Sequence, residues 1–227
     1  MSRFARVVVP DCPHHVTQRG NARRDVFSSV TDRHVYLELL QQYSQHYGLG
    51  ILGYCLMSNH VHLVVIPSRV DSLAKAMREV HGRYARYRNT VESSSGHLWQ
   101  GRFYSCPFEA TRVGTVMRYV ELNPVRANLV TRAEDYAWSS ALIHLGGRDA
   151  TGMLARRWWD QQWPVRDWAR MLREGEDEAA SIREATHTGR PLGNKAFIGD
   201  LEHRLSRKLA ASKGGRPRGT LAQSAAA

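Results

Sequence analysis

Two histidines separated by one residue, His60 and His62, stand in the stretch SNHVHLVVIP, which is otherwise typical of a buried β-strand. Alternate residues of a strand share a face, so both imidazoles point the same way, about 7 Å apart along a backbone that rises ~3.3 Å per residue. Two neutral imidazoles side by side can chelate one divalent cation. They can equally be half-exposed sheet residues that hydrogen-bond to their neighbours. The pair alone leaves both interpretations open.

A tyrosine and an asparagine form a second candidate pair, in the stretch RYVELNP. Tyr119 and Asn123 are at positions i and i+4, which places them on one face of a helix. If this helix crosses the face that carries His60 and His62, the phenol and the imidazoles meet. A phenol can attack a phosphodiester and keep the bond energy as a phosphotyrosine ester. A single helical tyrosine more often belongs to a core, so this interpretation depends on the combination.

The charge of the chain favours a nucleic-acid partner. Thirty-two Lys and Arg against 21 Asp and Glu leave a formal net charge of +11, and 28 of the 32 cations are Arg. Arg presents a planar fork of donors that matches phosphate and stacks on bases. A genome that generally encodes Arg in place of Lys would produce the same excess, so composition alone does not decide.

Cysteine usage and hydropathy predict the compartment. The 3 cysteines have no CxxC spacing, no run approaches 18 apolar residues, and the N-terminus lacks a signal-peptide pattern. We therefore expect a cytoplasmic, nucleoid-associated protein with no membrane partner. No nucleotide cofactor is expected either, because the sequence contains no Walker-type loop.

The order of strand and helix signals predicts an α+β fold. Period-2 segments indicate strands, 3.6-period segments indicate helices, and Ser58–Asn59 indicates a tight hairpin. Thr31 is the expected N-cap of the first helix, and Gly48 its expected end. The predicted elements are a strand over 14–19, a helix over 31–47, strands over 51–57 and 60–66, a helix over 71–89, a strand within 97–110, and a helix over 111–130 that weakens before Pro124. This order predicts a small sandwich with helices packed on a mainly antiparallel sheet.

Three regions are expected along the chain. Residues 1–145 would form the domain just described, and residues 146–188, rich in Trp and charge, a helical extension. Residues 189–227 would form a basic tail that is partly disordered. The C-terminal extension is thus predicted to be helical and basic.

Three groups of residues are candidates for DNA contacts. The first surrounds the Gly20–Asn21 break and comprises Arg19, Asn21, Arg23 and Arg24. The second, Arg83, Arg86 and Arg102, stands close in sequence to the rings of Tyr84, Tyr87, Trp99 and Phe103, and basic grooves with stacking rings hold single strands. These rings can instead belong to the core, with the arginines on a solvated face. The third, Arg216 and Arg218 in GGRPRG, is typical of a minor-groove hook, although short basic tails are common.

The motifs resemble those of a known family. NHVHLVV has the histidine–hydrophobic–histidine form of HUH nucleases, and RYVELNPVRANLV is similar to the tyrosine helix of single-tyrosine bacterial transposases. HHVTQRGNARRDVF, YCLMSNHVHLVV, LWQGRFYSCPF and YAWSSA occur in an order similar to that of REP-associated tyrosine transposases. The resemblance covers roughly residues 3–145.

This resemblance implies a ferredoxin-like sandwich and a metal-dependent enzyme of DNA transposition. Such an enzyme cleaves and rejoins single-stranded DNA at the foot of a REP-like hairpin through a covalent 5′-phosphotyrosine. His60 and His62 would be metal ligands and Tyr119 the nucleophile. Asn123 would hold the position of a third ligand, where some relatives have Gln.

Several points stay open beside the resemblance. Mg²⁺ or Mn²⁺ suits a set of nitrogen and oxygen donors, and Mn²⁺ suits the mixture better. Relatives act as monomers or as dimers. A non-catalytic hairpin-binding regulatory protein derived from a transposase is an alternative function, as is a metal-dependent hydrolase that uses water.

Overall fold

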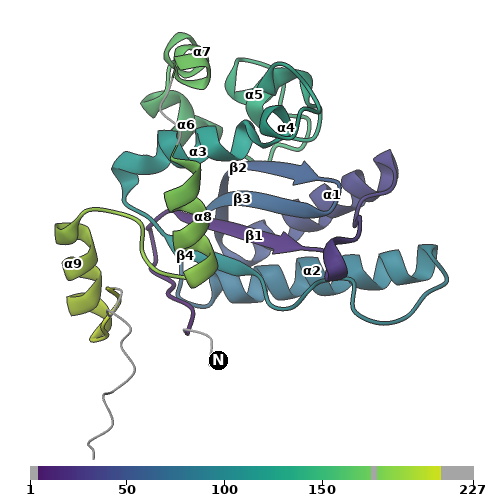
Figure 1. Ribbon diagram of the computed structural model, residues 1–227, viewed down its shortest axis with the longest axis horizontal. Helices are drawn as coiled ribbons and strands as arrows, with labels where there is room; N and C mark the ends of the chain where they lie inside the picture. Colours follow the sequence, from purple (N-terminus) through teal and green to yellow (C-terminus); the bar gives the residue numbers. More distant parts are fainter. Residues whose placement is uncertain (1–4, 175–177, 211–227) are drawn as a thin grey trace, which may run out of the picture.

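A four-stranded antiparallel sheet forms the centre of the protein, as shown by a computed structural model that describes residues 5–174 and 178–210 (Figure 1). The strands are β1 (His14–Arg19), β2 (Leu49–Met57), β3 (His60–Pro67) and β4 (Tyr104–Pro107). The first four helices along the chain are α1 (Val30–Tyr47), α2 (Ser72–Val91), α3 (Val113–Glu121) and α4 (Asn123–Arg126). The later helices are α5 (Ala141–His144), α6 (Arg156–Gln162), α7 (Val165–Glu174), α8 (Ala179–Thr188) and α9 (Lys195–Leu205). Short 3₁₀ turns cover Asn21–Arg23, Ala110–Arg112 and Ala133–Asp135.

The sheet has the strand order β2-β3-β1-β4, and each neighbouring pair is antiparallel. Together with α1 and α2 this gives the β-α-β-β-α-β arrangement of a ferredoxin-like sandwich, so the predicted fold class is confirmed. Helices α1 and α2 cover one face, whereas α3 packs on β2 and β3, and α8 packs on β1 and β4, across the other face (Figure 1). A site on that second face can therefore combine side chains from the sheet, α3 and α8.

Local sequence accounts for most element boundaries. Ser58–Asn59 makes the two-residue turn between β2 and β3, as predicted, and the left-handed Gly48, with φ of 63°, ends α1. The N-cap of α1 is Ser29, not Thr31: the Ser29 hydroxyl accepts from the Asp32 N–H, and the Asp32 carboxylate accepts from the Ser29 N–H. This reciprocal capping box satisfies two donors at once, which a cap at Thr31 would leave open.

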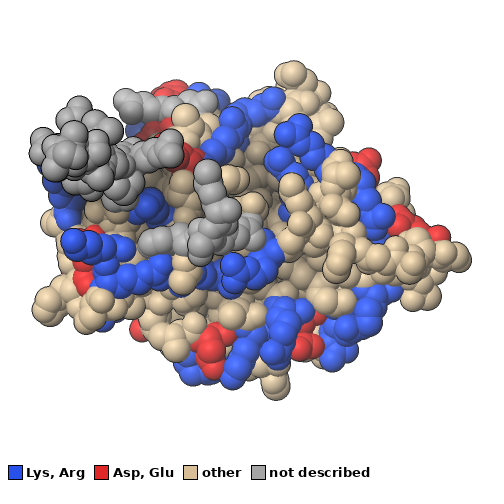
Figure 2. Space-filling model, turned by 60° about the horizontal axis from the view of Figure 1, so that its bottom comes forward, with Lys and Arg blue, Asp and Glu red and all other residues tan. Residues whose placement is uncertain are grey.

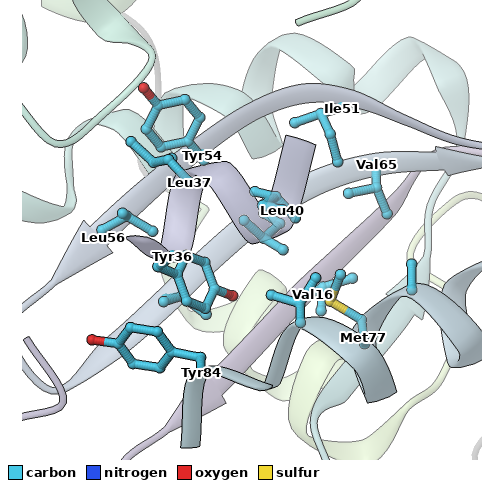
Figure 3. Close-up of a cluster of buried hydrophobic side chains, with 14 of the residues drawn as sticks. Val16, Tyr36, Leu37, Leu40, Ile51, Tyr54, Leu56, Val65, Met77 and Tyr84 are labelled. Atoms are coloured by element: carbon cyan, nitrogen blue, oxygen red, sulfur yellow. The ribbon is translucent and has the colours of Figure 1, made fainter. Parts of the chain in front are cut away.

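The face toward α1 and α2 is the main hydrophobic core. Val61, Leu63 and Val65 alternate with the histidines along β3 and are fully buried in it. Tyr36 from α1 and Tyr84 from α2 meet ring to ring in the same cluster (Figure 3). Tyr84 is 0% exposed and Trp99 is 9% exposed. These two rings therefore belong to the core and are not available to stack on bases.

The opposite face carries a second core that holds α3 in place. Trp159 from α6 and Trp168 from α7 pack against α3 within this cluster, edge to face at 4.8 Å. The buried Glu121 carboxylate, at the end of α3, accepts hydrogen bonds from the Ser140 hydroxyl, the His144 ring and the Trp168 indole N–H. The extension thus packs on the helix that carries Tyr119.

The third predicted helix is interrupted before Pro124, as expected. Helix α3 ends at Glu121, Leu122 is not helical, and α4 begins at Asn123 with Pro124 in its first turn. Tyr119 and Asn123 consequently lie on two consecutive helices, and their relation is set by the turn at Leu122. The predicted strand within 97–110 is shorter than its pattern, because only Tyr104–Pro107 pairs with β1 as a ladder.

The last helix, α9, packs against the segment that precedes β1. Leu201 of α9 lies in one hydrophobic cluster with Val7 and Val9 of that segment. Within the described residues, no helix is long and apolar enough to span a bilayer. Arg216 and Arg218 lie outside the described residues.

Candidate active site

A cavity of about 660 Å³ opens on the second face of the sheet, between β1, β3, β4, α3 and α8. It brings together six residues singled out from the sequence: Arg19, Arg23, His60, His62, Tyr119 and Asn123. It also contains residues that sequence reasoning did not select, among them His15, Arg183 and Thr186. The predicted meeting of the phenol with the paired imidazoles is therefore present within one chain.

The tautomer of His60 is set by Asn59, in the turn between β2 and β3. Its Nδ1 lies 2.6 Å from the Asn59 Oδ1, while the Asn59 Nδ2 donates to the Arg23 carbonyl at 3.2 Å. Since the amide oxygen can only accept, Nδ1 of His60 carries the hydrogen. Its Nε2 is left with a lone pair that a cation can use.

Both imidazoles are held in the neutral form. Burial, with a smaller contribution from the Arg19 charge, lowers the pKa of His60 to about 4. Burial first, and then the neighbouring His60 and His15 rings, hold the pKa of His62 well below its ordinary value. The rings of His60 and His62 are 4.9 Å apart between centroids and inclined at 80°. A neutral, paired arrangement of this kind is what a metal ligand requires.

Tyr119 lies in the cavity wall and is 6% exposed. Its ring meets the rings of His15 and His62 edge to face, each at 5.6 Å between centroids. The guanidinium of Arg126 lies 4.6 Å from the centroid of the same ring, and that of Arg183 lies 5.9 Å from it. The phenol is thus set between two imidazoles and two cations.

Asn123 has its amide group oriented by the end of α3. Its Nδ2 donates to the carbonyls of Tyr119, at 3.0 Å, and Val120, at 3.2 Å. The amide nitrogen is thereby used as a helix cap, and Oδ1 remains as the atom that can coordinate. Arg126 also donates to the Tyr119 carbonyl, which reinforces the same turn.

The donor set fits a divalent cation with mixed ligands. Among residues 5–174 and 178–210, no three His, Cys, Asp or Glu side chains are grouped to hold a metal ion. The donors that line the cavity and could hold a cation are the Nε2 atoms of His60 and His62 and the Asn123 amide oxygen. Such a set leaves coordination positions for phosphate oxygens and suits Mn²⁺ or Mg²⁺.

His15 and Thr186 are two of the residues that sequence reasoning missed, beside Arg126 and Arg183. His15 Nε2 lies 2.9 Å from His62 Nδ1, and His15 Nδ1 lies 2.7 Å from the Thr186 hydroxyl. Burial lowers the pKa of His15 to about 3. The period of the strand over 14–19 places His15 on the same face as Thr17 and Arg19, which was the available signal. Thr186 had none, because it is 171 residues away in the chain.

The end of β1 and the loop after it present two of the predicted basic residues to the cavity. Arg19 and Arg23 line it, whereas Asn21 and Arg24 are exposed outside it, and Arg24 is 3.7 Å from the Glu92 carboxylate. The loop is held in place by hydrogen bonds from the Gly20 N–H to the Asn59 carbonyl and from the Asn21 N–H to the Leu98 carbonyl.

The second group of basic candidates does not reach this cavity. Arg83 and Arg86 lie on α2, on the other side of the sheet, and Arg83 pairs with Glu79. Arg102 lines a hollow of about 600 Å³ beside α2, and a small hollow that shares Tyr104, Thr186 and His187 with the cavity. Lys and Arg side chains gather in clusters over the face shown in Figure 2, with acidic side chains between them. Contacts of Arg83, Arg86 and Arg102 with DNA stay predictions.

Comparison with known proteins agrees with this architecture. One solved structure, of a REP-associated tyrosine transposase bound to a REP hairpin, superposes with a TM-score of 0.54 at 17% identity, covering 64% of this chain and 86% of that chain. A second, of a candidate transposase from Deinococcus radiodurans R1, has a TM-score of 0.36 at 17% identity over 53% of this chain and 96% of that chain, and is too dissimilar to bear on the argument. No curated protein matches the chain.

The fold and the family match together define a DNA-processing protein of the transposase type. Residues 8–123, more than half of the 227-residue chain, match the family described as "Transposase IS200 like". The chain belongs to this IS200-like transposase family. The matched segment contains β1 to β4 and ends at Asn123, so it includes both histidines and Tyr119.

Proposed function

We propose that the protein is a metal-dependent, site-specific endonuclease and strand transferase that acts on single-stranded DNA at hairpins in DNA transposition. One observation carries the proposal: the Tyr119 ring lies edge to face with His62, in a cavity also lined by His60 and Asn123. The solved relative with the same fold is bound to a REP hairpin, which supports a palindromic hairpin as the substrate.

The proposed reaction is a transesterification. The Tyr119 hydroxyl oxygen forms a bond to the scissile phosphorus, and the bond from phosphorus to the 3′ oxygen breaks. The leaving 3′ oxygen takes up a proton, while the phenol loses its own. The 5′ end stays on Tyr119 as a phosphotyrosine, and attack by a 3′ hydroxyl reverses the step and rejoins a strand. No bond energy is lost to water, so a nucleotide cofactor is not needed.

Each residue of the cavity has a proposed part in this step. A bound Mg²⁺ or Mn²⁺ would polarise the scissile phosphate and align it for in-line attack. His60, His62 and Asn123 would hold that ion, and Tyr119 would supply the attacking oxygen. Arg126 and Arg183 lie within 6 Å of the Tyr119 ring, where their charges would offset the negative charge that develops around the scissile phosphate in the transition state. Arg19 and Arg23, at the rim, would hold the phosphates of the strand.

The cellular setting follows from the substrate. Because hairpin DNA is the proposed target, the protein would act in the cytoplasm at the nucleoid. One chain contributes every residue of the proposed site, so a monomer suffices, and a homodimer is compatible with it.

The test is adduct formation on labelled hairpin oligonucleotides with single-stranded flanks, in Mg²⁺ or Mn²⁺. Wild-type protein should give a covalent protein–DNA species on denaturing gels, and chelation of the metal should abolish it. Tyr119→Phe should lose the adduct and the nick while hairpin binding in gel shifts is nearly unchanged. Tyr104→Phe is the matched control, because Tyr104 lines the same cavity and should retain the adduct.

Three outcomes would contradict the proposal in different ways. Cleavage that survives Tyr119→Phe but is lost in His60→Ala would indicate a hydrolase that uses water. Tight hairpin binding without nicking in either metal would indicate a non-catalytic regulatory protein. An adduct that is retained in Tyr119→Phe but lost in Tyr104→Phe would show that the nucleophile is Tyr104 and that Tyr119 is misassigned.

A further inference from the structure

A chain of three hydrogen bonds runs from α8 through β1 to the histidine pair. The Thr186 hydroxyl donates to the Ile182 carbonyl at 2.7 Å, and the same oxygen lies 2.7 Å from His15 Nδ1. His15 Nε2 lies 2.9 Å from His62 Nδ1. Thr186, His15 and His62 are 2%, 1% and 5% exposed, so these groups are largely shielded from bulk water.

The direction of each hydrogen bond follows from the inventory of protons. A carbonyl can only accept, so the single hydroxyl proton of Thr186 points to Ile182, and its oxygen must accept from His15. A neutral imidazole has one N–H, so the His15 hydrogen is on Nδ1 and its Nε2 accepts. His62 must then carry its own hydrogen on Nδ1, which leaves the lone pair on Nε2.

A neighbouring cysteine supports this assignment of the Thr186 oxygen. The Cys106 thiol lies 3.4 Å from it, and burial raises the pKa of that thiol to about 12. The thiol is therefore protonated and can donate into the second lone pair of the oxygen. One donated and two accepted hydrogen bonds saturate a hydroxyl group.

We propose that Thr186 and His15 are positioning residues that select the Nδ1–H tautomer of His62 and so present its Nε2 to the divalent cation. The identity of the ligand as a cation rests on the function proposed above. His60 is held in the same tautomer by a different device, the Asn59 amide and the Arg23 carbonyl behind it. Both ligand nitrogens are thereby preset before a cation binds, as the outer partners of metal-bound histidines generally do.

The inference extends the site into the C-terminal extension. Thr186 lies beyond residues 8–123, the segment that matches the family, and it reaches His15 because α8 packs on β1 and β4. The catalytic sheet therefore depends on α8 for the state of one of its two imidazoles, and α8 has a role besides covering apolar surface.

The experiment compares Thr186→Val, which removes the hydroxyl at nearly constant volume, with Thr186→Ser, which keeps it. Thr188→Val is the matched control, because the Thr188 hydroxyl makes the same bond to the preceding turn, to the Glu184 carbonyl at 2.8 Å, but is exposed. The first readout is long-range ¹H–¹⁵N NMR of the imidazole nitrogens in metal-free protein, with His62 assigned from the spectrum of His62→Gln. The second is the affinity for Mn²⁺, measured by electron paramagnetic resonance of the free ion.

Wild type, Thr186→Ser and Thr188→Val should show His62 with hydrogen on Nδ1. Thr186→Val should show hydrogen on Nε2 of His62 in a substantial fraction, together with an affinity for Mn²⁺ that is about 10- to 100-fold weaker. A wild-type His62 with hydrogen on Nε2, or a Thr186→Val protein with unchanged tautomer and Mn²⁺ affinity, would overturn the proposal. The tautomer measurement needs neither metal nor DNA, so it tests the positioning role even if the chain fails to nick hairpins.

Discussion

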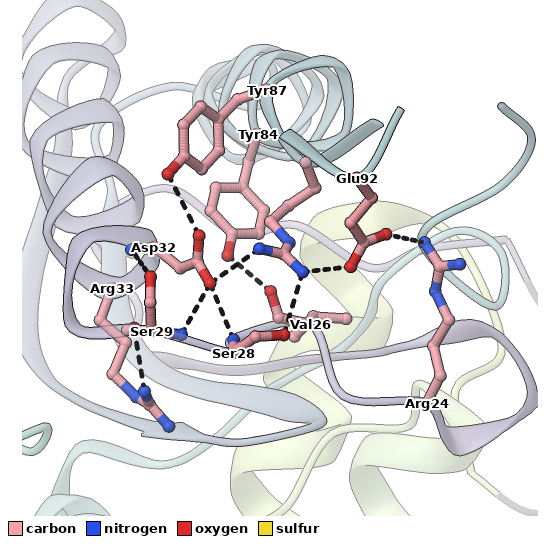
Figure 4. A network of polar contacts seen from close by, with 10 residues as sticks. Arg24, Val26, Ser28, Ser29, Asp32, Arg33, Tyr84, Tyr87 and Glu92 are labelled. Atoms are coloured by element: carbon pink, nitrogen blue, oxygen red, sulfur yellow. Dashed lines mark hydrogen bonds and ion pairs between the residues drawn. The ribbon is translucent and has the colours of Figure 1, made fainter. Parts of the chain in front are cut away.

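Asp32 is the acceptor at the centre of a buried polar network between α1 and α2, and its removal should destabilise the fold sharply (Figure 4). Its Oδ2 accepts from the backbone N–H groups of Ser28 and Ser29 and from the Arg88 guanidinium, each at 2.8 Å. Its Oδ1 accepts from the Tyr87 hydroxyl at 3.1 Å. Asp32 is 1% exposed and Arg88 is 2% exposed, so neither charge can turn to water.

The expected loss can be worked out from two contributions. Removing one partner of a buried ion pair costs about 3–5 kcal/mol, because the other charge loses its buried counter-ion. Among the described residues, Arg88 would keep only Glu92, whose side chain is 32% exposed, as an ion-pair partner. Losing the Asp32 half of the capping box, which accepts from the Ser29 N–H, adds about 1 kcal/mol. We therefore expect Asp32→Ala to lower the free energy of unfolding by roughly 4–6 kcal/mol, which for a chain of this size corresponds to a fall in Tm on the order of 10–20 °C.

Urea unfolding followed by tryptophan fluorescence measures this loss, and a double-mutant cycle with Arg88→Met isolates the pair. The double variant should be more stable than the sum of the two single losses predicts, because no unpaired charge remains buried. Asp71→Ala is the control: Asp71 also pairs with a cation near a helix start, Lys75 at 2.7 Å, but in solvent. A loss below about 1 kcal/mol for Asp32→Ala, or strict additivity in the cycle, would refute the reasoning.

Two further predictions concern the close packing of α3 and the buried histidines. A Cβ on Gly53 would lie 2.4 Å from the Met117 sulfur of α3. Gly53→Ala should therefore lower the free energy of unfolding in urea by about 1–3 kcal/mol, and it should reduce adduct yield more than hairpin binding. Gly50→Ala is the control: its Cβ would make ordinary contact at 3.5 Å, so it should change neither stability nor adduct yield. Burial lowers the pKa of His81 to about 3 and of His14 to about 4, from 6.5, so below pH 6.5 the unfolded chain binds protons that the fold does not. Stability should be level above that pH and fall as the pH drops, by ~1.4 kcal/mol per pH unit for each histidine, and His81→Gln should reduce the slope by about one proton. Urea titrations between pH 7.5 and 4.5 that gave a flat stability, or the same slope in the variant, would contradict this assignment.

Much of the site's framework could be predicted because it depends on short-range periodicity. The alternation in HVHLVV determines that His60 and His62 share one face of β3 while Val61, Leu63 and Val65 face α1 and α2. Ser58–Asn59 determines the hairpin, and Pro124 determines that the tyrosine helix ends before it. The order of these elements was enough to predict a small α+β sandwich with helices on a mainly antiparallel sheet, whereas its ferredoxin-like form was implied by the family resemblance. Each of these features is decided within a few residues, where backbone geometry and side-chain type act directly.

The tertiary structure alone decided which distant groups meet. The sequence could not tell whether Tyr84 and Trp99 stack on bases or fill a core, because a ring's exposure depends on what packs over it. It could not predict that Thr186 reaches His15, because their meeting depends on how α8 crosses β1 and β4. Periodicity determines which face of a strand or helix a side chain occupies. The distances between side chains on that face depend on how whole helices pack against the sheet. The hydrogen bonds from Thr186 through His15 to His62 therefore form only when α8 is packed on β1 and β4.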